Sequence, residues 1–157
     1  MTSLPPRLRA VCDLSVPTVR ENAGLHGYDG VVQDLTVDGV RRAVARLGGD
    51  PLEDPHDEAH LAAAEGGLRV AYGELELHRR DPLLHLENLD LAAYDREYAP
   101  EGERAEARRR HLTAWPDAVD MAVTTLDAVP APVAEALAPA VAGLAAAIPP
   151  GDDAHLV

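Results

Sequence analysis

A pair of histidines four residues apart is the first feature of this sequence that could support chemistry. His56 and His60 flank Asp57 and Glu58 in the run His-Asp-Glu-Ala-His. Side chains four residues apart lie on one face of a helix, so the two imidazoles could share a metal ion, with Asp57 or Glu58 as a third ligand. The pattern raises the hypothesis of a small metal-dependent hydrolase.

The order of the acidic residues argues against a catalytic zinc helix. In the motif of zinc peptidases a Glu directly follows the first His, and in the inverted form a Glu directly precedes the second. Glu58 occupies neither position. Acidic residues are also favoured in the first turn of a helix, here after an N-cap at Asp54. We therefore interpret the run chiefly as a helix start and rank the hydrolase last among three functional hypotheses.

A second group of polar side chains, His26, Tyr28 and Asp29, falls in a glycine-rich loop over residues 22–30. A loop can present such side chains to a ligand or to a neighbouring domain. The alternative is that Asp29 and Gly30 make a turn while Tyr28 packs its ring and bonds its hydroxyl locally. We favour the turn and keep His26, Tyr28 and Asp29 as candidate contacts to a ligand or another domain.

The elements that position these residues are expected to be helices. Runs that alternate β-branched or aromatic residues with polar ones are scarce, whereas apolar residues recur at helical spacing. Only 3% of residues are aromatic, so Leu, Val and Ala must fill the interior. The sequence predicts an all-α fold, with one domain of about six or seven helices and short loops over residues 1–150. A flexible tail is predicted over residues 151–157.

Prolines and capping residues place the helices of the first half. An opening helix is expected over residues 4–14, with a restart at Pro17 and an N-cap at Thr36 for the next helix. A long helix is predicted from Pro55 to Arg80. Its two central glycines, 66–67, are expected at a helix crossing. The buried face of this helix is predicted to carry Leu61, Ala64, Leu68, Ala71 and Leu75.

The second half is expected to hold shorter elements. A short helix or irregular packed segment is predicted over residues 83–98. A charged helix then runs from Glu101 to Leu112, and Trp115 with Pro116 opens another. The last helix is expected over residues 133–148, bent at Pro139.

Charge and cysteine content limit the partners and the compartment. Fourteen Lys and Arg stand against 27 Asp and Glu, a formal net charge of −13, so nucleic acid is not expected as a partner. The most apolar segment, 131–148, is mostly alanine and is interrupted by Glu135 and Pro139, so no membrane span is predicted. A lone cysteine, Cys12, fits a reducing compartment, and we expect a cytoplasmic location.

Two segments of the chain resemble a known family. Gly24 to Thr36, Gly-Leu-His-Gly-Tyr-Asp-Gly-Val-Val-Gln-Asp-Leu-Thr, is similar to a segment near the start of domain-of-unknown-function family 885, bacterial relatives of zinc metallopeptidases. Residues 80–104, with Asp-Pro-Leu-Leu-His, Leu-Asp, Tyr-Ala-Pro and Glu-Arg, resemble a later block of that family. The likeness continues to Gly143. Asp81 stands where the family usually has Asn, and His85 where it often has an aromatic residue.

The resemblance implies an all-helical lobe that forms one wall of a peptide- or substrate-binding cleft. It covers only the N-terminal part of a family member, and the family's zinc motif is expected beyond this length. No catalytic residue and no cofactor are therefore expected in this chain, and zinc would belong to a C-terminal peptidase-like domain. A stand-alone relative of this lobe is equally consistent with the resemblance. The second hypothesis is a helical interaction module that pairs with a copy of itself or with a partner.

Overall fold

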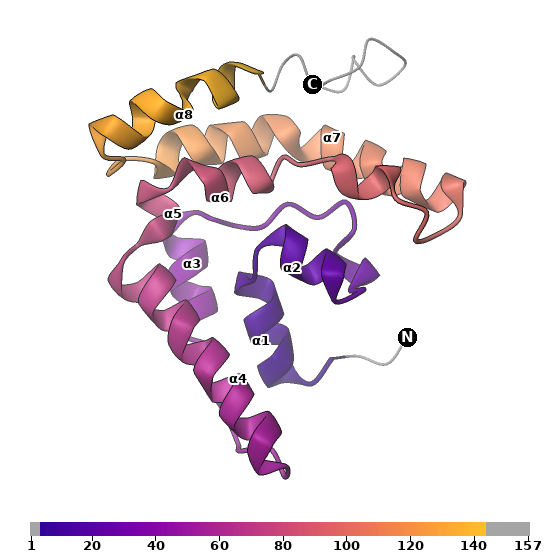
Figure 1. The fold of residues 1–157 in the computed structure, drawn as a ribbon, viewed down its shortest axis with the longest axis vertical. Coiled ribbons are helices and arrows are strands. Elements are labelled where there is room, and N and C mark those ends of the chain that lie inside the picture. The colour runs from indigo at the N-terminus through magenta and orange to yellow at the C-terminus, as the bar shows by residue number, and fades with distance from the viewer. Residues whose placement is uncertain (1–3, 144–157) are drawn as a thin grey trace.

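The computed structural model describes residues 4–143, and all regular structure in that range is helical (Figure 1). The prediction of an all-α fold with short loops is confirmed. Within the described range, eight α-helices follow one another along the chain. They are α1 (Pro6–Leu14), α2 (Pro17–Asn22), α3 (Val37–Val44), α4 (Pro55–Leu68), α5 (Leu77–Arg80), α6 (Pro82–Glu87), α7 (Glu101–Thr125) and α8 (Ala131–Gly143).

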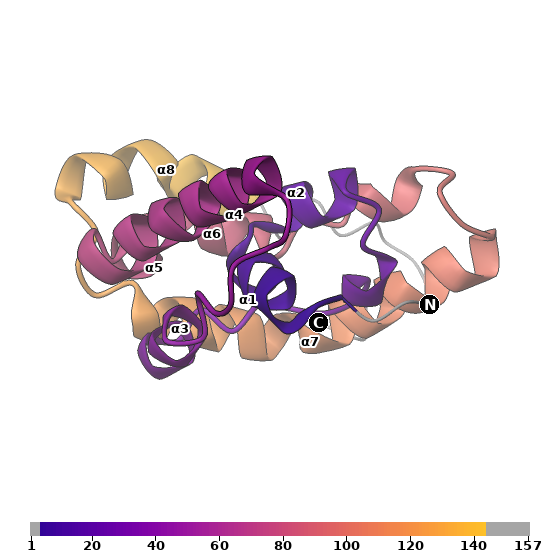
Figure 2. The ribbon, with the colours of Figure 1, turned by 90° about the horizontal axis from the view of Figure 1, so that it is seen from below.

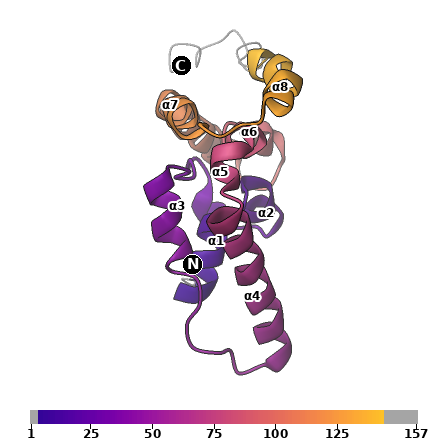
Figure 3. The same ribbon diagram turned by 90° about the vertical axis from the view of Figure 1, so that its left-hand side faces the viewer.

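The helices form two groups that meet along the middle of the molecule. Seen edge-on, α6, α7 and α8 lie at one end, while α4 extends to the other (Figure 3). In the second group α1 packs against both α3 and α4 (Figure 2). The loop between α2 and α3 runs along α7 and so connects the two groups (Figure 1).

Each group has its own apolar core. The core of the group with α1, α3 and α4 is centred on Leu14, Leu35 and Val40, which are almost completely buried between α1, α3 and the loop before α3. The core of the group with α6, α7 and α8 is centred on Leu112 and Trp115 of α7. Aliphatic side chains dominate both cores, as the low aromatic content requires.

The predicted N-caps are confirmed. The Thr36 hydroxyl accepts a hydrogen bond from the backbone N–H of Gly39 at 3.0 Å. The Asp54 carboxylate accepts from the N–H groups of His56 and Asp57. Such caps satisfy donors that the first helical turn leaves unpaired. The restart at Pro17 is also confirmed, since α2 begins there.

The prediction of one helix from residue 55 to residue 80 is wrong. The α-helix ends at Leu68 and continues as a π-helical segment, Arg69–Glu74. Glu76 then adopts a left-handed conformation with φ of 48°, which breaks the helix before α5. The wider π turn changes the direction in which later side chains point. Leu75, predicted to be buried, is therefore 51% exposed, whereas Tyr72 is buried.

The expected helix crossing at Gly66 and Gly67 is also wrong. A Cβ atom at either position would meet nothing within 4 Å. The close contact of α4 is made instead by the buried side chain of Glu65. The predicted stripe fails at Ala64 as well, because this residue is exposed.

The prediction that a new helix opens at Trp115 and Pro116 is wrong, because α7 is one helix from Glu101 to Thr125. Proline removes one backbone N–H from the helical ladder and crowds the preceding turn. Buried Leu112 and Trp115 before it and Ala118 after it belong to the same core, so packing on both sides of Pro116 outweighs this cost.

The last described helix, α8, includes Pro139 and has no buried residue between Ala131 and Gly143. It lies beside α6 at the edge of the molecule (Figure 1). The predicted helix end at residue 148 and the predicted tail over 151–157 lie outside the described residues. Among the helices that the structure describes, none combines the length and apolar character that crossing a bilayer requires.

Candidate functional site

The loop between α2 and α3 is held in place by a chain of buried hydrogen bonds. The Gly30 N–H donates to the Tyr94 hydroxyl at 2.9 Å. The Tyr94 hydroxyl contacts His111 Nδ1 at 2.9 Å, and His111 Nε2 contacts the Asn88 carbonyl oxygen at 2.8 Å. Because a carbonyl can only accept, His111 carries its proton on Nε2 and accepts from Tyr94 on Nδ1.

A second pair of bonds fixes the loop three residues later. The Gln33 N–H donates to Asn88 Oδ1 at 2.7 Å, and Asn88 Nδ2 donates to the Gln33 carbonyl at 2.8 Å. The buried side-chain amide of Asn88 thus pairs with both backbone groups of Gln33, as a neighbouring strand would. Such a paired, buried amide fixes the position of the loop against the chain after α6.

Burial sets the protonation of this network. It raises the pKa of Tyr94 to about 12. It lowers the pKa of His111, although the bond to the Asn88 carbonyl acts in the opposite direction. A neutral His111 agrees with the bond from Tyr94, because a protonated Nδ1 could not accept it.

His26 and Asp29 lie on one side of the loop. The His26 ring stacks on Tyr98, with ring centroids 4.6 Å apart and an interplanar angle of 4°. His26 Nδ1 lies 3.4 Å from an Asp29 carboxylate oxygen. These three side chains line an open groove of about 490 Å³ together with the start of α7, including Arg110. We call this the His26 groove.

Tyr28 lies on the other side of the loop and does not contact His26 or Asp29 through its hydroxyl. That hydroxyl donates to Asp13 Oδ1 of α1 at 2.7 Å. The Tyr28 ring lies against two guanidinium groups, with Arg20 Cζ 4.7 Å and Arg9 Cζ 5.3 Å from the ring centroid. The expected local bond of Tyr28 is therefore a bond to a different helix, fifteen residues away in sequence.

A second groove, of about 350 Å³, opens beside Tyr28 between α1, α2 and α3. We call it the Arg20 groove. Its lining includes Arg20, Arg42 and Arg46 together with Asp13 and Asp34. Arg46 pairs with Asp13 at 3.2 Å and Arg42 with Asp34 at 3.4 Å. Arg20 is only 4% exposed, and burial lowers its pKa.

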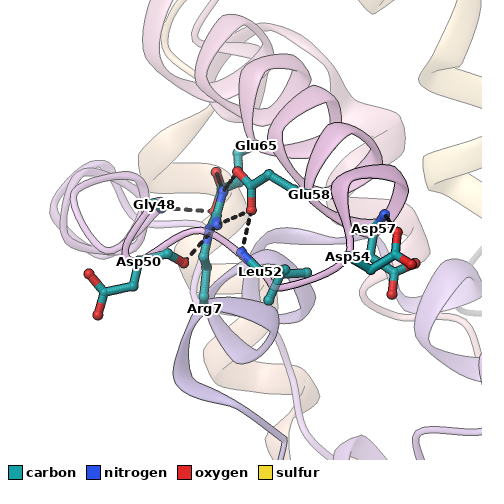
Figure 4. Close-up of polar contacts among 8 residues, drawn as sticks. All are labelled: Arg7, Gly48, Asp50, Leu52, Asp54, Asp57, Glu58 and Glu65. Atoms are coloured by element: carbon teal, nitrogen blue, oxygen red, sulfur yellow. Dashed lines mark hydrogen bonds and ion pairs between the residues drawn. The ribbon is translucent and has the colours of Figure 1, made fainter.

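His56 and His60 stay exposed on α4, and the carboxylate of Glu58 between them is engaged elsewhere. Glu58 accepts two hydrogen bonds from Arg7, at 2.7 and 3.0 Å, and one from the Leu52 N–H. Asp57 points away from this cluster (Figure 4). Among the described residues, no group of three or more His, Cys, Asp or Glu side chains is arranged to hold a metal ion.

Arg7, Glu58 and Glu65 form a group of ion pairs, the Arg7 cluster (Figure 4). Arg7 Nε and Nη2 donate to the two carboxylate oxygens of Glu65 at 2.8 and 3.0 Å, and Glu65 also accepts from the Gly48 N–H. Hydrogen bonding by Arg7 lowers the pKa of both Glu65 and Glu58. The cluster joins the start of α1 to α4 and has a structural role.

Comparison with known proteins gives no match. No family model, no curated protein and no solved structure matches this chain. The resemblance of residues 24–36 and 80–104 to domain-of-unknown-function family 885 therefore stays a prediction.

Sequence reasoning selected the loop but missed most of its partners. His111 could have been found, because it shares a helix face with Trp115 and Ala118, at spacings of four and seven residues. Arg20 gave no such signal. Its burial depends on Tyr28 and on the opposite wall of the groove, which only the tertiary fold brings together.

Proposed function

We propose that this chain is a non-catalytic helical lobe that forms one wall of a peptide- or substrate-binding cleft. One observation carries the proposal: the two segments behind the resemblance to domain-of-unknown-function family 885, 24–36 and 80–104, lie against each other. They are joined by the bond from Gly30 to Tyr94, by the paired amides of Gln33 and Asn88, and by the stacked rings of His26 and Tyr98.

The chemistry of the His26 groove suits recognition of a peptide. A groove needs apolar rings for contact and a few polar groups for orientation. Here the stacked rings of His26 and Tyr98 supply apolar surface. Charged groups also line the groove, with Asp29, Glu103 and Glu106 outnumbering Arg110, so a basic group of the peptide would be favoured. The nearby polar side chains Tyr94 and His111 are already engaged in holding the loop, which favours binding over catalysis.

Binding without cleavage is the test. We would mix the purified chain with a peptide library and identify retained peptides by mass spectrometry, with and without added zinc. The expected result is retention of intact peptides that weakens in His26→Ala and persists in His56→Ala, which removes another exposed histidine, on α4. Cleaved peptides, or equal binding by both variants, would contradict the proposal.

The proposal includes a place and a partner for the lobe. The natural neighbour would be a C-terminal peptidase-like domain, which would carry the zinc, so the lobe itself needs no cofactor. A cytoplasmic location is part of this proposal and is supported by the single cysteine, Cys12. The formal net charge of −13 favours partners other than nucleic acid.

A second candidate is a homodimer formed through α8. This helix is mostly apolar and has no buried residue, and Val141 on it is 49% exposed. On neighbouring α7, Val123 is 78% exposed. Exposed apolar surface of this kind is typical of contact sites. Size-exclusion chromatography with light scattering would detect the dimer, and a strict monomer at the highest soluble concentration would rule it out.

A further inference from the structure

Arg20 is a buried cation whose main hydrogen-bonding edge is unused. Its side chain lines both the Arg20 groove and a smaller cavity, and the residue is 4% exposed. Two of its nitrogen atoms, Nε and Nη2, are buried and make no hydrogen bond to the described residues. The face of the Tyr28 ring, 4.7 Å away, offers attraction to the charge but accepts no directed bond from this edge.

A buried charged donor without an acceptor is rare in folded proteins, because removal from water is compensated by pairing. The same chain shows what this edge of an arginine usually holds. Nε and Nη2 of Arg7 bind both oxygens of Glu65, at 2.8 and 3.0 Å. Nε and Nη2 of Arg79 bind both oxygens of Asp127, at 2.8 and 2.9 Å. The two parallel bonds match the spacing of a carboxylate.

The Arg20 groove has the charge to attract an anion, although the chain as a whole is acidic. Its lining contains three arginines and two aspartates, which leaves an excess of one positive charge. The two carboxylates are already paired, Asp13 with Arg46 and Asp34 with Arg42. Asp13 also accepts the Tyr28 hydroxyl proton, so neither aspartate is placed to take up the free edge of Arg20.

We propose that the Arg20 groove binds a small organic carboxylate, with both carboxylate oxygens on Nε and Nη2 of Arg20. Arg42 and Arg46, which are exposed at the mouth, guide the anion inward. A volume of about 350 Å³ lies near the lower end of the usual range for small-ligand pockets, which fits a compact metabolite. Both Arg20 nitrogens are covered by neighbouring atoms, so side chains over the guanidinium move when the ligand enters. The site is independent of the His26 groove.

The first experiment titrates the purified full chain with acetate, succinate and benzoate, and follows the arginine Nε–H signals by nuclear magnetic resonance. Binding of at least one carboxylate should shift the Arg20 Nε–H signal in a saturable way. Succinamide, which has the shape of succinate without its charge, should cause no shift. Inorganic phosphate tests an oxyanion of different geometry. The proposal is overturned if no carboxylate binds, or if phosphate binds more tightly than every carboxylate.

Variants at the mouth avoid the risk that loss of Arg20 prevents folding. Arg42→Gln combined with Arg46→Gln changes exposed side chains only. The affinity for the carboxylate should fall by about tenfold or more, since charge-assisted attraction is lost. Arg41→Gln is the matched control: Arg41 lies next to Arg42 but pairs with Asp38 outside the groove, so affinity should stay unchanged. Equal affinity in all three proteins would overturn the assignment.

Arg20→Lys tests whether the paired donors Nε and Nη2 of Arg20 bind the carboxylate. Lysine keeps the charge but lacks the planar pair of donors. Circular dichroism first checks that the variant is folded. The folded variant should then lose the saturable shifts that the carboxylate causes in Tyr28 and in its neighbours. Retained binding at the original affinity would show that the carboxylate binds elsewhere.

Discussion

The Tyr94 hydroxyl donates a hydrogen bond to Nδ1 of His111 across a buried contact of 2.9 Å. The same hydroxyl accepts from the Gly30 N–H, and His111 donates onward to the Asn88 carbonyl. Each donor thus has one acceptor, and the direction of every bond follows from the neutral state of His111. The position of the loop on α7 is therefore linked to the protonation of one imidazole.

Acidification should destabilise the fold through its buried histidines. Burial lowers the pKa of His78, His85 and His111, so the unfolded chain binds protons more readily than the folded chain. Their contribution is complete above the ordinary histidine pKa of about 6.5 and is lost as the pH falls below it. The urea midpoint should decrease between about pH 7.5 and about pH 5. The substitution His111→Gln, which keeps one donor and one acceptor without titrating, should flatten this dependence, and an unchanged dependence would contradict the role of His111.

Removing the Tyr94 hydroxyl should lower the free energy of unfolding. Tyr94→Phe leaves the Gly30 N–H and His111 Nδ1 without a partner, and an unsatisfied buried polar group costs about 1–3 kcal/mol. Tyr98→Phe is the matched control, because the buried Tyr98 hydroxyl lies near Asp29 but forms no well-aligned hydrogen bond among the described residues. Urea unfolding should show a clear loss for the first variant and almost none for the second. Equal losses would mean that the network adds no stability.

Gly24 and Gly30 differ in the space available for a side chain, and alanine substitutions test this difference. Gly30 and Gly24 both have positive φ, 73° and 67°, so an added Cβ strains the backbone at each. At Gly30 the Cβ would also lie 2.7 Å from the Ala107 carbonyl oxygen of α7, whereas at Gly24 it meets nothing within 4 Å. Gly30→Ala should therefore lose about 1–3 kcal/mol more than Gly24→Ala, the usual cost of overpacking. Thermal unfolding of the two proteins measures this difference, and a loss at Gly24 as large as at Gly30 would argue against close packing of the loop on α7.

The Arg7 cluster should stabilise the fold only while Glu65 is ionised. Arg7→Met leaves the buried Glu65 carboxylate without its cation and should lower the melting temperature at neutral pH. Because Arg7 lowers the pKa of Glu65 in the folded chain, its contribution is present above the ordinary glutamate pKa and is lost below it. The gap between the two proteins should therefore close on acidification below about pH 4.3. Arg41→Met, which breaks an exposed pair with Asp38, should show no such gap at any pH.

Purified protein should carry no stoichiometric metal. His56 and His60 are exposed, and the carboxylate of Glu58 is bound to Arg7. Elemental analysis for zinc, manganese and iron after purification without chelators measures the content. One metal ion per chain that disappears in the variant His56→Ala with His60→Ala would instead support the metal-dependent hydrolase.

Local signals in the sequence predicted the fold where local chemistry decides it. The caps at Thr36 and Asp54 and the restart at Pro17 depend on a few neighbouring residues and a fixed backbone preference, and all three are confirmed. The prediction of a helix break at Pro116 fails because the packing of core residues on both sides overrides the local preference of proline for a break.

The candidate site was only partly predictable. His26, Tyr28 and Asp29 do face grooves, but the loop divides them between two sides. The burial of Glu65 requires Arg7, 58 residues earlier in the chain, and nothing in the spacing of either residue indicates their contact. Long-range ionic pairs of this kind produce no regular spacing in the sequence from which they could be predicted.

Because α7 is one unbroken helix, it fixes the distance between the two points at which the loop is anchored to it. Arg110 donates to the Asp29 carbonyl near one end of the stretch, and the Leu35 N–H donates to Met121 Sδ at the other end. Eleven residues of helix from Arg110 to Met121 rise about 16 Å. The six steps from Asp29 to Leu35 reach at most about 22 Å when fully extended. Loss of two residues from this stretch would reduce its maximal reach to about 14 Å, less than the rise of the helix between the two anchors, so its length is under tighter constraint than that of an ordinary surface loop.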